Sequence, residues 1–191
     1  GGSVASLLGS EGTAARIYFP RFTSMLKTDS SLPGQPFDFT TRNRRPPTDP
    51  VNCLLSFVYA LIVKDLTVAS FAIGFDPYIG FMHRPRFGRP ALARDLAEEF
   101  RPLHGDSTVI GLINDGEIRP GHFTIRAGGV ALTPDGRRKV LRAYERRLRV
   151  TLTHPRFGYA ITHRRLYELQ ARILAATILG EVDAYEPVVT R

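Results

Sequence analysis

The sequence predicts an all-α fold, a multi-helix domain over residues 1–191 with at most one small β-hairpin. Three observations support this prediction. Apolar side chains recur at one-turn spacing in several segments, proline and capping residues mark where these segments begin and end, and one stretch alone alternates like a hairpin. A chain of 191 residues can also bury a core of its own as one domain.

The chain is expected to begin with a helix over residues 4–22, which Pro20 should kink or end. Residues 23–49 follow as a long loop, because they hold four prolines among many Ser, Thr and Asp residues. A connection of this length without secondary structure is uncommon and points to function or mobility. It ends in the basic cluster 42–45, for which a solvated turn is the alternative interpretation.

Asp49 and Pro50 are a cap followed by proline at the first helical position. They predict a central, almost wholly apolar helix over 50–64, and a second buried helix follows over 66–75. The polar exceptions Asn52, Ser56 and Tyr59 share one stripe of the first of these helices. Such a stripe faces either a functional site or a set of internal hydrogen bonds, and the spacing does not decide between them.

The second half of the chain continues the helical pattern. Leu92, Leu96 and Phe100 form a core stripe on a helix that begins at Arg89-Pro90 and ends at Arg101-Pro102. The remaining expected elements are a helix over 108–114, a hairpin over 122–133, a long basic helix over 134–149, a last helix over 162–179 capped by Thr162, and an exposed tail over 181–191.

The charge indicates a nucleic-acid partner. The chain has 26 Lys and Arg against 18 Asp and Glu, a net charge of +8, and most of its cations are arginine. An acidic protein partner, or a chain that is merely basic without a charged partner, is the alternative. The single cysteine, Cys53, excludes a disulfide within the chain and a cysteine-rich zinc site, and is typical of a cytoplasmic protein. The apolar run 51–63 is shorter than the ~20 residues that span a bilayer, so no membrane association is expected.

The stretch 80–102 carries the chemistry that stands out most. It holds His83, an arginine-rich loop, and a helix with the carboxylates Asp95, Glu98 and Glu99. Imidazole and carboxylates beside arginines can hold a divalent metal next to a phosphate. Spacing alone does not certify such a site, and helix geometry places Glu99 nearer the core stripe than Glu98. A loop histidine and ordinary surface acids are the alternatives.

Several motifs in order resemble one known family. They are Glu11-Gly-Thr-Ala-Ala-Arg-Ile-Tyr-Phe19, the segment Arg42 to Tyr59, the segment Asp76 to Pro102, and, more weakly, Gly136 to Lys139 with the closing helix and Tyr185-Glu186-Pro187. Together they span almost the whole chain and resemble the catalytic α-helical domain of the CRISPR-associated integrase, which cuts and joins DNA in spacer acquisition. Members of that family normally begin with a β-rich domain, so an excised domain or part of a fusion is expected here.

The resemblance implies a Mg²⁺ or Mn²⁺ site made by Glu11, His83 and Glu98. It also implies a supporting acid at Asp95, and we assign supporting roles to Asn52 and Tyr18. The DNA contacts are expected from arginines beside these motifs: Arg16, Arg42, Arg44, Arg45, Arg84, Arg86 and Arg89. Arginines that grip phosphates supply affinity for the DNA backbone rather than recognition of its sequence.

The expected function is therefore a metal-dependent DNA integrase and endonuclease that inserts short foreign DNA fragments into a CRISPR repeat by attack of a 3′-hydroxyl on a phosphodiester. The implied partners are double-stranded DNA (prespacer and repeat), a second copy in the full-length protein, and a small ferredoxin-like CRISPR-associated subunit. Two alternatives stay open: a basic helical DNA-binding scaffold without activity, and a general metal-dependent repair nuclease.

Overall fold

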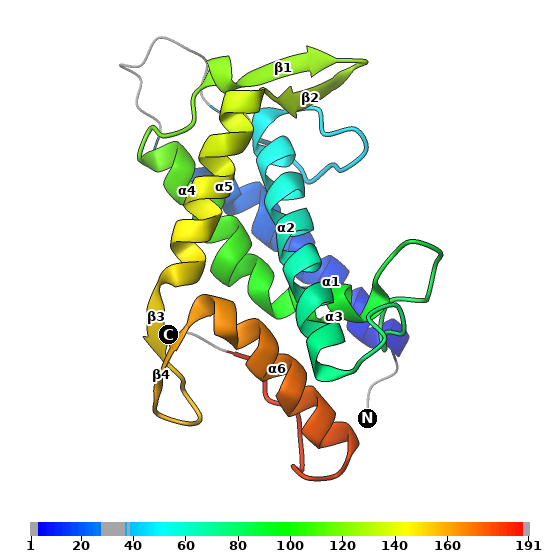
Figure 1. Cartoon of the computed structure of the whole chain (residues 1–191). Coiled ribbons are helices and arrows are strands. Elements are labelled where there is room, and N and C mark those ends of the chain that lie inside the picture. The colour runs from blue at the N-terminus through cyan, green and yellow to red at the C-terminus, as the bar shows by residue number, and fades with distance from the viewer. Residues whose placement is uncertain (1–3, 28–36, 38, 189–191) are drawn as a thin grey trace. The chain divides into compact units, whose positions relative to one another are not determined.

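The mostly helical prediction is confirmed. The structure, a computed structural model, describes residues 4–27, 37 and 39–188 (Figure 1). These residues form helices joined by short connections and two small antiparallel sheets. The chain divides into two compact units, Gly1–Val58 with Thr108–Ala143, and Tyr59–Ser107 with Tyr144–Arg191. The prediction allowed one hairpin, whereas the described residues contain two.

The first unit opens with helix α1, Val4–Tyr18, which tightens into a 3-10 helix over Phe19–Met25. Pro20 stands in the first turn of that 3-10 helix, where its missing N–H is not needed, so it changes the helix type rather than ending the segment. Phe22 on this segment is fully buried and packs against Phe39. The rest of the expected 23–49 loop lies partly outside the described residues.

Helix α2, Pro50–Ile73, begins where the Asp49-Pro50 pair predicts. The Asp49 side chain caps it by accepting the backbone N–H of Asn52 at 2.8 Å. The expected break near residue 65 is wrong, because α2 is one continuous helix of 24 residues. No proline or glycine interrupts this stretch, and charged side chains alone do not end a helix.

By length and composition α2 also passes the test for a helix that can cross a membrane, although the apolar run 51–63 within it is too short by itself. The fully buried side chains of α2 include Leu54, Leu66 and the polar Asn52 and Ser70. Buried polar groups within such a packed helix are typical of the core of a globular protein. The burial pattern therefore favours a core helix.

The expected hairpin over 122–133 is confirmed. Strands β1, Phe123–Arg126, and β2, Gly129–Leu132, pair antiparallel around Ala127 and Gly128, both with positive φ. Helix α4, Ser107–Asn114, precedes this hairpin and α5, Pro134–Arg149, follows it. The Thr133 hydroxyl caps α5 by accepting the backbone N–H of Gly136 at 3.1 Å.

The second unit contains α3, Ala91–Phe100, a π-helical turn over Arg101–Asp106, and α6, His163–Ile178. Thr162 caps α6 as predicted, because its hydroxyl accepts the backbone N–H of Arg165. Between α5 and α6 lies the hairpin that the sequence did not predict, β3, Thr151–Thr153, with β4, Ala160–Thr162. Strands of three residues are too short for alternation to be recognised.

The final segment, 181–188 as described, is not simply an exposed tail. Val188 is only 8% exposed, and its backbone N–H donates to Glu99 at 2.9 Å. The carbonyl of Glu186 accepts a hydrogen bond from Gln170 on α6 at 3.1 Å. These contacts anchor the segment to α3 and α6, although most of its described residues are exposed.

Candidate active site

Asp95 on α3 holds the loop that carries His83. Its two carboxylate oxygens accept three consecutive backbone N–H groups, from Phe81 at 2.6 Å, Met82 at 3.0 Å and His83 at 3.0 Å. The same carboxylate meets the Nδ1 atom of His83 at 2.6 Å. Four bonds to one side chain that is 9% exposed fix the loop against α3.

Gly80 allows this close approach of loop and helix. A Cβ atom at this position would stand 2.6 Å from the Asp95 carboxylate and 2.8 Å from the backbone carbon of Ala91. Real side chains do not make such short contacts, and one of the atoms in the way is backbone. A glycine at residue 80 is therefore a condition for the hydrogen bonds that Asp95 makes.

The ring of His83 is oriented by Asp95. Because the carboxylate of Asp95 can only accept, it fixes a proton on Nδ1, and in the neutral imidazole the lone pair then lies on the other ring nitrogen, Nε2. The side chain is 21% exposed, so the ring is held but not enclosed. A histidine whose second nitrogen is held by a carboxylate is the usual arrangement of a histidine that binds a metal.

Glu98 lies one turn after Asp95 and forms an ion pair with Arg101. The guanidinium of Arg101 also lies over the ring of Tyr59, 5.1 Å from its centroid. The Tyr59 hydroxyl in turn donates to the buried Asp106 at 2.5 Å. Glu98 keeps a quarter of its side chain exposed, so a partly open carboxylate is held by an arginine that is itself fixed.

The neighbouring acid, Glu99, has a different environment. Its carboxylate accepts hydrogen bonds from Gln170 at 3.2 Å, from the Tyr185 hydroxyl, and from the backbone of Val188. Burial raises the pKa of Glu99 above its usual range, although these three donors act in the opposite direction. Glu99 therefore anchors the last segment of the chain, and Glu98 is the more accessible of the two acids.

Glu11, the third expected metal ligand, lies on an exposed part of α1 in the first unit. His83, Asp95 and Glu98 belong to the second unit. Among the residues that the structure describes, no three His, Cys, Asp or Glu side chains are grouped closely enough to hold a metal ion. The chemistry and local support of His83 and Glu98 nevertheless fit Mg²⁺ or Mn²⁺, which take oxygen ligands and accept imidazole.

The polar stripe on α2 does not face one common site. Arg42 donates to Asn52 at 2.7 Å and to Ser56 at 3.0 Å. The Asn52 amide donates to Asp49 at 2.6 Å and to the carbonyl of Thr41 at 2.9 Å. Within the first unit, the Asn52 amide thus holds the end of the 23–49 loop. Tyr59, in the second unit, donates its hydroxyl to Asp106 instead.

The other predicted residues occupy varied positions. The Tyr18 ring packs edge-on against Phe19 and Phe22, at 5.3 and 6.1 Å between centroids. The loop after His83 makes a tight turn, in which Arg89 donates its backbone N–H to Arg86 at 3.0 Å. The arginines expected to contact DNA differ in exposure: Arg42 and Arg89 are half-buried, and the exposed ones are Arg16, Arg44, Arg45, Arg84 and Arg86.

Sequence reasoning missed a buried network in the second unit. His104 meets the Tyr167 hydroxyl at 2.8 Å and His163 at 2.7 Å, and the Tyr144 hydroxyl links Tyr167 to Asp65, 3.1 Å from each. Burial lowers the pKa of His104 to about 3 and that of His163 to about 4, so both are neutral at pH 7. These residues share no sequence pattern, since they come from four separate segments.

Comparison with known proteins gives a consistent result. The sequence model of a family described as CRISPR associated protein Cas1 matches residues 2–146. The chain is 54% identical over 189 residues to a CRISPR-associated exonuclease Cas4/endonuclease Cas1 fusion of Geobacter sulfurreducens, covering 99% of this chain and 34% of that protein. It is 43% identical to a CRISPR-associated endonuclease Cas1 of Chlorobaculum tepidum, covering 96% of this chain and 52% of that protein.

Two solved structures extend the likeness to the fold. A casposase bound to integration product matches with a TM-score of 0.85 and 27% identity, over 96% of this chain and 50% of that one. A Cas6-RT-Cas1–Cas2 complex contains a chain that matches with a TM-score of 0.81 and 26% identity, over 99% of this chain and 20% of that one. The chain therefore spans between a fifth and about half of these four proteins.

Proposed function

The chain belongs to the CRISPR-associated protein Cas1 family, and from that premise we propose that it provides the catalytic centre of a metal-dependent DNA integrase and endonuclease. In this proposal, the whole protein inserts short foreign DNA fragments into a CRISPR repeat as part of antiviral defence in the cytoplasm. The fold likeness to a casposase supports the joining reaction, because that casposase is bound to an integration product.

One observation carries the assignment of the site. Asp95 holds both the backbone and the ring of His83, which leaves Nε2 with a lone pair, and Glu98 presents a carboxylate one turn further along α3. A buried histidine used only for packing has no need of such an orienting carboxylate. With Glu11 from the first unit, His83 and Glu98 would bind Mg²⁺ or Mn²⁺ through two oxygens and one nitrogen.

When bound, such an ion polarises a phosphoryl oxygen and offsets the negative charge that develops on the leaving oxygen. The protein's own residues supply the positioning. Asp95 keeps His83 in one tautomer, and Arg101 holds the carboxylate of Glu98. The exposed Arg84 and Arg86, on the loop directly after His83, offer guanidinium groups to the DNA backbone.

In the joining reaction, the 3′-hydroxyl of the incoming fragment attacks the phosphorus of a repeat phosphodiester in line with the bond that breaks. A new P–O bond forms as the bond to the 3′-oxygen of the repeat strand breaks. The departing 3′-oxygen takes up a proton, and the attacking hydroxyl loses one. Water in place of the 3′-hydroxyl gives cleavage at the same centre.

The proposed partners are double-stranded DNA, a second copy of the protein, and a small CRISPR-associated subunit of ferredoxin-like fold. The fold likeness to a chain within a Cas6-RT-Cas1–Cas2 complex supports a partner subunit. The net charge of +8 supports the DNA. Binding through ~6 phosphate contacts would weaken roughly a thousandfold between 50 and 200 mM salt.

The test is strand transfer of a labelled fragment into a repeat-bearing plasmid by the full-length protein, with and without Mn²⁺. We expect Glu11→Ala, His83→Ala and Glu98→Ala to abolish metal-dependent joining, whereas Glu168→Ala, an exposed glutamate on α6, retains it. Joining that persists in all three variants would overturn the assignment. Joining without metal would contradict the metal dependence. Binding of DNA without any joining would favour the scaffold, and cleavage of branched DNA without repeat preference would favour a repair nuclease.

A further inference from the structure

The connection between β3 and β4, residues 154–159, presents two aromatic rings to solvent. We call this segment the hairpin tip. Phe157 is 45% exposed and Tyr159 is 47% exposed. Their rings are nearly parallel, with 15° between planes and 5.9 Å between centroids. Exposed aromatic residues that stack on each other, away from any core, are unusual in a part of the chain with no assigned role.

The buried His154, which is only 3% exposed, holds the conformation of the hairpin tip. The His154 ring packs against both aromatics, 4.8 Å from the Phe157 centroid and 6.2 Å from that of Tyr159. Its Nδ1 atom accepts the backbone N–H groups of Arg156 at 3.2 Å and Phe157 at 3.3 Å. Backbone bonds from His154 to Tyr159 and from Gly158 to His154, both 2.9 Å, close the turn. The rings are therefore held in place before any ligand arrives.

The sequence on both sides of the hairpin tip is basic. Between Arg146 and Tyr167 the chain contains six arginines and no acidic residue. Arg147 and Arg164 are used inside the unit, by the carbonyl of Leu103 and by Glu145. Arg149 and Arg165 are exposed, one just before β3 and the other just after β4. Cations thus flank the base of the hairpin, and Arg156 stands at its tip.

We propose that the hairpin tip is a stacking platform for an unpaired DNA base, with Arg149 and Arg165 holding the flanking phosphates. The inference rests on the proposed function for its DNA ligand. Aromatic faces beside a positively charged surface are the general means of binding single-stranded nucleic acid. Aromatic residues and arginine are also enriched at protein interfaces. The net charge of +8 on the chain favours DNA over a protein.

The spacing of the rings specifies the mode of stacking. A base inserted between two rings needs about 7 Å between their planes, twice the ~3.4 Å separation of stacked bases. Since the Phe157 and Tyr159 centroids are 5.9 Å apart, no base fits between them. The base therefore stacks on an outer face of the pair. In a duplex such faces are covered by neighbouring bases, so the ligand is an unpaired or terminal base.

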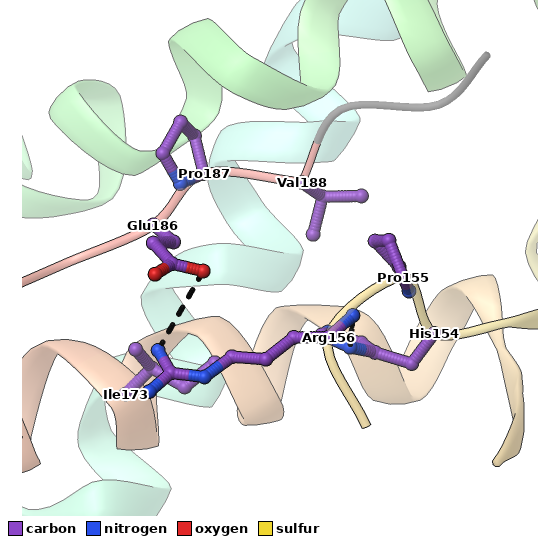
Figure 2. A pocket seen from close by; sticks show the side chains of 7 residues that line it. All are labelled: His154, Pro155, Arg156, Ile173, Glu186, Pro187 and Val188. Atoms are coloured by element: carbon purple, nitrogen blue, oxygen red, sulfur yellow. Dashed lines mark hydrogen bonds and ion pairs between the residues drawn. The ribbon is translucent and has the colours of Figure 1, made fainter. Parts of the chain in front are cut away.

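A pocket of about 230 Å³ connects the hairpin tip to the segment that Glu99 anchors (Figure 2). Figure 2 shows Glu186 pointing from that segment toward Arg156, and the two side chains form an ion pair at 3.8 Å. Arg156 also lies over the Phe157 ring, 5.6 Å from its centroid. Glu186 consequently competes with a phosphate for Arg156, and Val188 in the same pocket donates to Glu99, the residue after Glu98.

The test compares a blunt DNA duplex with the same duplex carrying a short unpaired end, using fluorescence anisotropy with the full chain in EDTA. Without metal, binding is measured apart from strand transfer. We expect Tyr159→Leu to weaken binding of the unpaired end about five- to 150-fold, the range for losing one stacked base. Tyr159→Phe, which keeps the ring, serves as the matched control and retains the affinity. Glu186→Gln strengthens binding about twofold, because it frees Arg156.

A second readout reports stacking itself. With 2-aminopurine at the unpaired position, the wild-type protein quenches the fluorescence, and Tyr159→Leu does not. Equal loss of affinity for both DNAs, or unchanged quenching in Tyr159→Leu, overturns the inference and leaves the proposed function standing. A change of oligomeric state in Tyr159→Leu, with DNA affinity unchanged, would identify a protein contact instead. A wild-type protein that binds neither DNA contradicts the proposed function.

Discussion

Two histidine sites in the second unit use the same side chain in opposite ways. His83 is partly exposed, its Nδ1 meets the Asp95 carboxylate, and Nε2 remains available. His104 is fully buried and uses both ring nitrogens, for Tyr167 and His163. A histidine with one nitrogen bound to a carboxylate is prepared for a ligand, whereas one with both nitrogens occupied in the core is a packing element.

The direction of protons in the buried network follows from its partners. Tyr144 has one hydroxyl hydrogen, and we assign it to Asp65, which accepts only. Tyr167 then donates to Tyr144, His104 donates from Nδ1 to Tyr167, and His163 donates to Nε2 of His104. Every member is satisfied while both histidines are neutral. Protonation of His104 at Nε2 would place two donors face to face, because His163 already donates to that nitrogen.

The largest effect that separates the two sites is expected from acid. The folded-state pKa values of His104 and His163 are lowered to about 3 and about 4, below the ~6.5 of an unfolded histidine. The unfolded chain therefore binds more protons below pH 6.5, so stability present above that pH is lost as the pH falls. At pH 5 the loss is about 2 kcal/mol per histidine, measured as the free energy of urea unfolding from pH 7 to 5.

The matched variants sharpen this prediction. His104→Asn removes one titrating group, so it should reduce the acid-dependent loss by about half while lowering stability at pH 7. His122→Asn, at a half-buried histidine outside the network, controls for the general effect of replacing a histidine by asparagine. If His104→Asn does not change how the unfolding free energy falls between pH 7 and 5, then other groups cause the acid sensitivity.

The second prediction concerns His104→Ala. The variant leaves a cavity beside Phe100, which stacks on the His104 ring, and deprives Tyr167 and His163 of partners. We expect a loss of about 3 kcal/mol in unfolding free energy, from the cavity together with the unsatisfied polar groups. Strand transfer by the folded protein should survive at permissive temperature. Loss of strand transfer with unchanged stability would contradict the assignment of His104 to the core and of His83 to the active site.

Gly80→Ala tests whether the backbone of the loop that carries His83 must lie close to α3. The added methyl group meets Asp95 at 2.6 Å, so the loop must move and the bonds to Phe81, Met82 and His83 are broken or stretched. We expect strand transfer to fall about a hundredfold, because His83 loses its orientation. Gly111→Ala, at a helical glycine with open space around it, is the control and should keep full activity.

The smallest expected effect belongs to Asp95→Asn. The amide keeps its size and one acceptor oxygen, but its NH₂ group faces backbone donors of the 81–83 loop. Loss of an orienting carboxylate commonly costs 10–100-fold in metal affinity or activity, and we expect about this reduction in strand transfer. Higher Mn²⁺ should restore part of the rate. A variant with wild-type rates at low Mn²⁺ would remove Asp95 from the mechanism.

The sequence by itself predicted a helical fold, the start of α2 at Asp49-Pro50, the cap at Thr162 and the β1–β2 hairpin. These features follow from local chemistry, since caps, prolines and turn glycines act on neighbouring backbone groups. The resemblance carried by the motifs also agrees with the family to which the chain belongs. The metal ligands Glu11, His83 and Glu98 stay a prediction.

Only the tertiary structure decided which of two adjacent acids is tied up in packing and which remains more accessible. Glu98 and Glu99 are adjacent in the sequence, yet Glu99 is taken by Tyr185 and Val188, more than eighty residues away in the chain. The His104 network likewise joins residues from four separate segments of the chain. Long-range packing determines which polar groups lose water and which find a donor, and no local pattern records that outcome.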